Sequence, residues 1–255
     1  MGADLMAADP RRNFEPAEWA LRCDLAAAYR LIARFGMDDL IFTHLSVRLP
    51  GPDHRFLLNP YGLLFDEITA SSLVAVDPEG HAIDSQEDSK INNAGFTIHS
   101  AVHMARPDAQ CVMHTHTMAG MAVAAQDQGL LPLNQMSMEF FGHVAYHGYE
   151  GIALDLDERE RLVADLGPHS AMILRHHGLL TTGRTVAEAF YYMYYLEQAC
   201  RIQVTATQGG QRVSLPANKV AEHTASQFSR LAGKGERPWA ALKRRLDRES
   251  PDYAS

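Results

Sequence analysis

The chain contains little cysteine, and what it has is not arranged as a disulfide framework. Its three cysteines, Cys23, Cys111 and Cys200, are odd in number and widely spaced, and no C-x-x-C pair occurs. Small secreted domains that depend on disulfides show the opposite pattern. We therefore expect the protein to work in a reducing compartment, the cytoplasm.

Signals for a membrane or for export are also missing. No apolar run approaches the roughly 20 residues that a membrane-spanning helix needs. Residues 1–10 lack the basic start and the apolar core of a secretory signal. We therefore expect no membrane partner.

The chain has fewer positively charged than negatively charged residues. The chain has 23 Lys and Arg against 31 Asp and Glu, which gives a net charge of −8 with neutral histidines. Nucleic acids and anionic membranes attract basic surfaces, so this balance argues against both. The hydrophobic fraction of 46% and the charged fraction of 21% are ordinary for a globular protein. We expect a small-molecule substrate as the partner.

Histidine is abundant instead, with 13 in the chain. His114 and His116 lie two residues apart at the end of an apolar run that begins at Cys111. In an extended strand they would share one face, so that their ring nitrogens could converge on one metal ion. The alternative is a pair of histidines at a strand end that bond only to backbone or water.

A third histidine strengthens the metal hypothesis. Residues 170–178 resemble a second buried strand that ends in His176 and His177 and breaks at Gly178. Two strands that both end in histidine can place three imidazoles around one ion and leave the open coordination position of a catalytic zinc or a non-haem iron. His176 and His177 cannot face the same way on a strand, so only one of them can be a ligand.

Two further histidines, His99 and His103, lie four residues apart on a helix predicted over 96–105. That spacing puts them on one helix face, where they too could bind a metal. We favour the alternative that His99 is packed or hydrogen-bonded within the buried face of the helix.

Helical and strand patterns mix along the chain. Apolar residues recur at helical spacing over 16–35, and a helix is predicted to begin at Thr185 and to continue to about Thr207. Short strands followed by turns are predicted over residues 43–48, 54–59 and 73–77. The mixture predicts one α/β domain around a largely antiparallel sheet.

Several motifs together resemble one known family. They are Asp39-Leu-Ile-Phe-Thr-His44-Leu-Ser46-Val-Arg48, Asn59-Pro-Tyr-Gly62, Asn93-Ala-Gly95-Phe-Thr-Ile-His99, His114-Thr-His116 and Arg175-His-His177-Gly178. In this order and spacing they resemble the class II aldolase/adducin family over roughly residues 17–210. We expect a flexible leader over 1–14, the family domain over 15–210 and a C-terminal helical tail over 211–255.

The resemblance implies a three-layer α/β/α fold with a central, mainly antiparallel sheet. It also implies a homotetramer with active sites at subunit interfaces. By position, the family's divalent metal would be held by His114, His116 and His177. Zinc is our first choice for the ion, and manganese, iron and cobalt are alternatives because each accepts imidazole.

The chain departs from the sugar-phosphate aldolases of that family. Those enzymes carry Ser-Ser-Glu where this chain has Asn93-Ala94-Gly95, and Gly-Asn where it has Thr43-His44. In them the serines hold a phosphate and the glutamate moves a proton, which Gly95 cannot do. In these respects the chain is more similar to adducin head domains and their bacterial relatives.

Other residues would then have to bind the substrate and move the proton. Our candidates for substrate binding are Asn93, Gly62 and Thr43. Our candidates for the acid or base are Tyr146, Glu139 and His44. As alternatives, Glu139 would be a solvated helix charge and Tyr146 a packing residue at an interface.

Three functions remain open from the sequence. The first is a metal-dependent lyase, similar to an aldolase, that cleaves a carbon–carbon bond in an unphosphorylated hydroxy-carbonyl compound. The second is a non-catalytic assembly module, as in adducin, with a retained metal site. The third is a non-haem iron oxygenase acting on a 2-oxo acid, although the usual iron triad includes a carboxylate.

Overall fold

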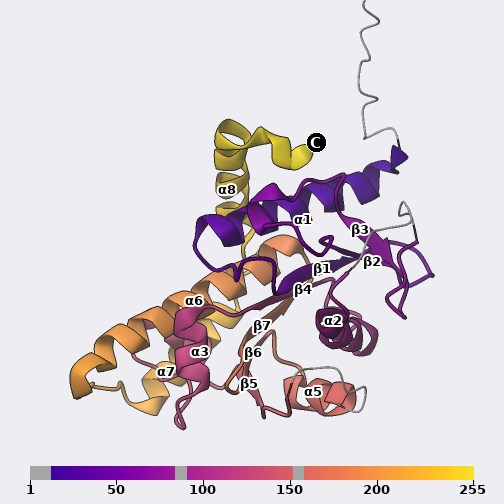
Figure 1. Cartoon of the computed structure of the whole chain (residues 1–255). Coiled ribbons are helices and arrows are strands. Elements are labelled where there is room, and N and C mark those ends of the chain that lie inside the picture. The colour runs from indigo at the N-terminus through magenta and orange to yellow at the C-terminus, as the bar shows by residue number, and fades with distance from the viewer. Residues whose placement is uncertain (1–12, 84–90, 152–157) are drawn as a thin grey trace, which may run out of the picture.

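The computed structural model describes residues 13–83, 91–151 and 158–255, where helices cover both faces of one central sheet (Figure 1). The helices are α1 (Pro16–Arg34), α2 (Asn93–Ala105), α3 (Met118–Ala124), α4 (Gln135–Glu139), α5 (Glu158–Leu166), α6 (Val186–Thr207), α7 (Asn218–Ser229) and α8 (Glu236–Glu249), with turns of 3₁₀ helix at Phe65–Glu67, Gln208–Gly210 and Pro251–Ala254. One face of the sheet packs against α1, α3, α6 and α8, and the other packs against α2 and α5. The predicted three-layer α/β/α fold is confirmed.

The sheet has seven strands within the described residues. They are β1 (His44–Arg48), β2 (Phe56–Leu58), β3 (Val74–Val76), β4 (Cys111–Thr115), β5 (Val144–His147), β6 (Ala171–Leu174) and β7 (Gly178–Gly183). The order across the sheet is β3-β2-β1-β4-β7-β6-β5, and every neighbouring pair is antiparallel except the parallel pair β5 and β6. The sheet is therefore mainly antiparallel, as predicted.

Strand β4 lies at the centre of the sheet and divides its side chains between the two faces. Cys111 and Met113 point into the larger core beneath α1 and α6, whereas Val112 points into the smaller core beneath α2 and α5. Because side chains alternate along a strand, His114 shares the face of Val112. His44 of β1 is the register partner of His114, so both histidines lie on the α2 face.

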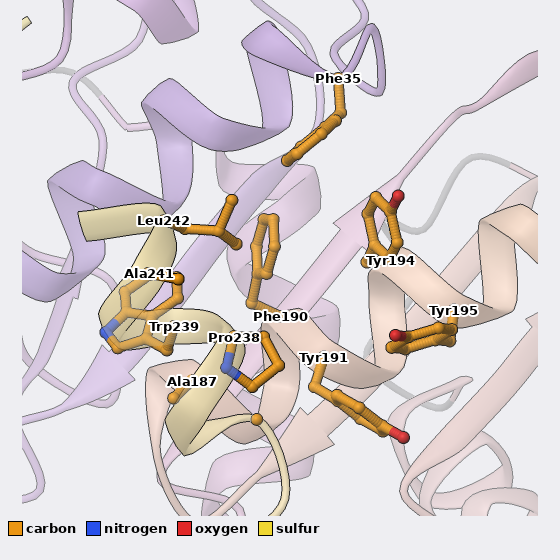
Figure 2. A pocket seen from close by; sticks show the side chains of 11 residues that line it. Phe35, Ala187, Phe190, Tyr191, Tyr194, Tyr195, Pro238, Trp239, Ala241 and Leu242 are labelled. Atoms are coloured by element: carbon orange, nitrogen blue, oxygen red, sulfur yellow. The ribbon is translucent and has the colours of Figure 1, made fainter. Parts of the chain in front are cut away.

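Helix α6 carries much of the larger core. Its N-terminus is capped by Thr185, whose hydroxyl oxygen accepts a hydrogen bond from the Glu188 N–H at 3.1 Å. Phe190 of this helix is buried and packs against Trp239 of α8, with ring centroids 5.6 Å apart. Side chains of α6 and α8, together with Phe35, line an apolar cavity of about 270 Å³ (Figure 2).

The expected C-terminal tail, residues 211–255, contains α7 and α8. Trp239 and Leu246 of α8 are buried, and the chain end returns to the first helix, where Arg30 pairs with Asp252 at 2.7 Å. The expected leader over 1–14 lies almost entirely outside the described residues. Within the described ranges, no helix is both long and apolar enough to cross a membrane.

Candidate metal centre

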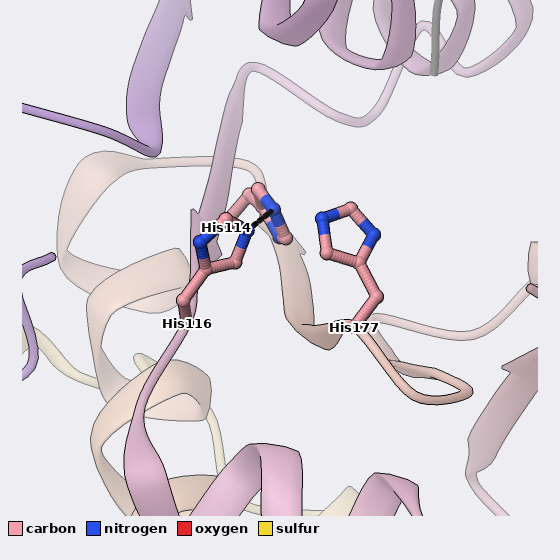
Figure 3. Close-up of side chains that lie close together, drawn as sticks. All are labelled: His114, His116 and His177. Carbon is pink, nitrogen blue, oxygen red and sulfur yellow. Dashed lines mark hydrogen bonds between the residues drawn. The ribbon is translucent and has the colours of Figure 1, made fainter. Parts of the chain in front are cut away.

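Three imidazole rings meet at one end of the sheet (Figure 3). His114 belongs to β4, His116 lies one residue beyond the end of β4, and His177 directly precedes β7. The ring centroids are 4.7 to 4.8 Å apart, and one nitrogen of each ring lies within 4.8 Å of the other two. The structure therefore brings together the three residues that the sequence nominated as metal ligands.

His177 reaches this site from a turn rather than from a strand end. Strand β6 ends at Leu174, and the next strand, β7, begins at Gly178. Our prediction that the strand continues to the histidines and breaks at Gly178 is wrong. His176 is left-handed, with a φ of 57°, so the alternation of side chains along a strand does not decide between His176 and His177.

Gly178 is needed because two backbones approach closely beside the cluster. A Cβ atom at this position would lie 2.4 Å from the carbonyl oxygen of Thr115 and 3.3 Å from Cδ2 of His116. Only glycine lets β7 pair with the end of β4 at this distance. This close approach brings His177 next to His116.

The hydrogen bonds of the rings fix where their protons are. Nδ1 of His114 donates to the carbonyl oxygen of Leu179 at 2.9 Å, and Nδ1 of His116 donates to a carboxylate oxygen of Asp39 at 2.9 Å. Both partners can only accept, so in the neutral rings each Nε2 carries a lone pair. These two Nε2 atoms lie 3.0 Å apart (Figure 3). Facing lone pairs repel unless a proton or a cation lies between them, and this donor set therefore fits a divalent metal.

Burial favours the neutral form of His114 and His177. It lowers the pKa of His114 well below the ordinary 6.5, and the neighbouring His177 and His116 lower it further. Burial, followed by the charge of His116, lowers the pKa of His177 to about 4. Near neutral pH both rings are thus in the unprotonated form that binds a metal ion.

A buried chain of polar side chains continues from the cluster beneath α2. The ring of His44 lies 6.0 Å from that of His114 and 4.0 Å from that of His99. The Ser46 hydroxyl lies 2.6 Å from Nδ1 of His99 and 2.7 Å from Nε2 of His103. The prediction that His99 is hydrogen-bonded within the buried face of its helix is confirmed.

The direction of this chain follows from its far end. Nδ1 of His103 lies 2.8 Å from the carbonyl oxygen of Ala109, which can only accept, so the ring proton is on Nδ1. The Ser46 hydroxyl then donates to Nε2 of His103 and accepts from Nδ1 of His99. We call Ser46, His99 and His103 the buried relay. It orients side chains, but it cannot carry a proton out of the molecule because it ends at a carbonyl.

The structure does not bring Tyr146 or Glu139 to the three histidines. The sheet register places Tyr146 three strands from β4, roughly 14 Å away at the usual strand spacing. Its hydroxyl oxygen accepts from the N–H of Leu130 at 2.9 Å. Glu139 is 5% exposed and pairs with Lys234 at 2.8 Å, so it is a buried ion-pair residue rather than a solvated helix charge.

The candidates for substrate binding lie in three different segments. Thr43 is buried directly before His44 with a φ of 64°, and among the described residues its hydroxyl has no hydrogen-bond partner. Gly62 lies in the turn after β2, two strands from β4, and has a φ of 109°. Asn93 is the first residue of α2, and its side chain is outside the described part of the structure. Thr43 is therefore next to His44, the register partner of His114.

Two residues at the site were not nominated from the sequence. Asp39 lies in the loop before β1, and no spacing pattern connects a loop carboxylate with a histidine 77 residues later. Tyr149 follows β5, is 54% exposed, and has its ring 6.4 Å from that of His177. The sequence analysis nominated Tyr146, three residues earlier, instead.

Comparisons with known proteins agree with this fold and site. An aldolase II superfamily protein from Pseudomonas syringae is 53% identical, with a TM-score of 0.92 over 96% of this chain and 99% of that one. An L-fuculose 1-phosphate aldolase from Glaciozyma antarctica is 32% identical, with a TM-score of 0.83 over 92% of each chain. Alpha-adducin of Rattus norvegicus is 47% identical over 201 residues, which are 77% of this chain but 27% of adducin. The model of the family described as class II aldolase and adducin N-terminal domain matches residues 23–204, and the chain belongs to that family.

Proposed function

We propose that the chain is a metal-dependent lyase that cleaves a carbon–carbon bond in an unphosphorylated hydroxy-carbonyl compound. One observation carries the proposal: nitrogens of His114, His116 and His177 converge, and in the described part of the chain these three residues form the complete group of possible ligands. Three protein donors leave coordination positions for substrate oxygens, as in catalytic metal sites. The family membership and the fold of an L-fuculose 1-phosphate aldolase support the same reaction class.

The protein side of the chemistry follows from the hydrogen bonds. A bound divalent ion, with zinc as our first choice and manganese, iron or cobalt as alternatives, would polarise the substrate's oxygens and stabilise the enolate left by bond cleavage. Leu179 and Asp39 keep protons on Nδ1 of His114 and His116, so that both Nε2 atoms remain donors to the ion. His44 is the nominated acid or base that lies nearest the cluster, 6.0 Å from the ring of His114.

The placement of the described lysine and arginine side chains around the three rings supports a substrate without phosphate. Arg175 lies in the turn that carries His177, yet its guanidinium donates to the carbonyl oxygen of Gln126 at 2.6 Å and lies over the ring of Tyr146. Within the described residues, no lysine or arginine side chain is hydrogen-bonded to the three rings. At the three rings, the described cationic side chains would therefore give a dianionic phosphate little charge compensation.

A retro-aldol assay on phosphorylated and unphosphorylated hydroxy acids and hydroxy ketones tests the proposal. Wild-type protein loaded with zinc, manganese, cobalt or iron should cleave an unphosphorylated member, and His114→Ala should not. His223→Ala, on an exposed face of α7, is the matched control and should keep full activity. Cleavage that survives in His114→Ala would contradict the proposal.

The adducin relative favours a second candidate, an assembly module in which the metal site is retained without turnover. It predicts metal binding but no cleavage of any substrate in the panel. A third outcome, oxygen uptake by the iron-loaded protein with an aryl 2-oxo acid, would replace the lyase by the oxygenase.

We also propose that the protein is a cytoplasmic homotetramer in which residues 15–210 form the catalytic unit and 211–255 a tail that stabilises it. Exposed apolar side chains beside the metal centre support an assembly, because Leu40 is 65% exposed and Met118 85% exposed. Light scattering should give four times the chain mass of 28.3 kDa. A monomeric mass would contradict the tetramer.

A further inference from the structure

We propose that Asp39 is the positioning residue of the metal centre. Its carboxylate accepts the Nδ1–H of His116 at 2.9 Å, and this contact keeps the Nε2 lone pair of His116 directed at the nitrogens of the other two ligands. The inference rests on the proposed metal site but not on the substrate or the reaction.

The loop that carries Asp39 is built to hold it in place. Met37, two residues before, is buried, and the N–H of Phe42 donates to the carbonyl oxygen of Asp39 at 2.8 Å. Leu40 and Thr43 are left-handed, with φ values of 53° and 64°. A β-branched residue such as Thr43 adopts this conformation only where its surroundings impose it. The loop is thus a tight, strained turn between a buried anchor and β1, the strand that pairs with β4.

The partner of His116 differs in kind from the partner of His114. His114 donates to a neutral carbonyl group, whereas His116 donates to a charged carboxylate, which makes the stronger acceptor. Within the described residues, no other carboxylate is hydrogen-bonded or ion-paired to any of the three rings. Asp39 therefore supplies the negative charge at this centre, and it acts through His116 rather than by touching the ion.

Removing Asp39 has a specific structural consequence. Without the carboxylate, the proton of neutral His116 can move from Nδ1 to Nε2. The Nε2–H then points at the lone pair of His114 Nε2, and the distance of 3.0 Å suits a hydrogen bond. This bond occupies the position of the ion, so a metal must first break it and displace the proton. Loss of a residue that hydrogen-bonds a metal-binding histidine in this way typically weakens metal affinity 10- to 100-fold.

Zinc affinity of the full-length protein, measured by competition with a chromophoric chelator, tests the inference. We expect the Kd to rise 10- to 100-fold in Asp39→Ala. In Asp39→Asn the rise should be smaller, because the amide oxygen still accepts the proton but carries no charge. Asp38→Ala removes the same charge from the neighbouring residue of the loop, and it should bind zinc within about threefold of wild type.

A second readout follows the proton directly. The ¹⁵N chemical shifts of the metal-free wild-type protein should show His116 with its proton on Nδ1, and those of Asp39→Ala should show it on Nε2. Wild-type affinity in Asp39→Ala, an equal loss in Asp38→Ala, or an Nε2–H form of His116 in the wild type would each overturn the inference. The wild-type shifts decide the matter even if the variants fold poorly.

Failure of this inference is distinguishable from failure of the proposed function. If the wild type binds zinc, His114→Ala does not, and Asp39→Ala binds like wild type, Asp39 has no positioning role and the metal site stands. If the affinities change as expected but no substrate is cleaved, the lyase proposal fails and the role of Asp39 remains. If the wild type binds no zinc, both are wrong.

Discussion

Replacing Ser46 by alanine should destabilise the protein through the buried relay. Ser46 is fully buried. Its hydroxyl accepts from Nδ1 of His99 at 2.6 Å and donates to Nε2 of His103 at 2.7 Å. Ser46→Ala leaves a buried donor and a buried acceptor without their partner. Each such group costs about 1–3 kcal/mol, and partial relaxation gives a total loss of about 2–4 kcal/mol.

For a chain of this length that loss corresponds to a decrease in Tm of roughly 4–16 °C. Urea denaturation should show a lower midpoint with an unchanged slope. Ser229→Ala is the matched control, because the Ser229 hydroxyl is exposed and donates only to the nearby carbonyl oxygen of Ser226. It should change stability by at most about 0.5 kcal/mol. If Ser46→Ala is no more destabilising than Ser229→Ala, the relay does not hold β1 and α2 together as described.

Two further predictions concern acid stability and the close approach at Gly178. Burial lowers the pKa of His103 to about 3, and burial followed by the charge of His44 lowers the pKa of His99 well below 6.5. Below about pH 6.5, His99 and His103 therefore bind more protons in the unfolded chain than in the folded one, so the free energy of unfolding should fall from pH 7 to pH 4. Urea titrations that show no decrease would contradict this. Gly178→Ala should weaken zinc binding in chelator competition, because its Cβ would lie 2.4 Å from the Thr115 carbonyl and would separate β7 from β4. The corresponding change at Gly142, where a Cβ meets no atom within 4 Å, should leave zinc affinity unchanged despite its left-handed φ, and equal effects at both glycines would refute the packing explanation.

The residue patterns predict a mixed α/β domain with a mainly antiparallel sheet and the pair His114 and His116, whereas the three layers and the choice of His177 over His176 came from the family resemblance. Alternation along β4, continued to the residue after its end, puts His114 and His116 on one side. The helical spacing of apolar residues and the Thr185 cap define α6. The turn at His177 was missed because the apolar run through Leu174 and the run from Leu179 look like one strand followed by a break. Turns of this kind depend on backbone approach, here at Gly178, which a single sequence does not display.

Asp39, the hydrogen-bond partner of His116, was missed for a different reason. Asp39 meets His116 only because β1 pairs with β4, and this contact depends on tertiary register rather than on local spacing. Glu139 could be nominated as an acid or base from its residue type, but its pairing with Lys234 is set by the packing of α4 against the chain between α7 and α8. Residue type identifies candidate chemistry, and the fold decides which candidates meet.

The most direct test of the metal centre is anomalous scattering from a crystal of the purified protein, combined with elemental analysis of the same sample. We predict one divalent ion per chain, bound by nitrogens of His114, His116 and His177, with at least one coordination position filled by a non-protein ligand. An ion sealed by a fourth protein group, or a site that stays empty after soaking in zinc, would contradict the account.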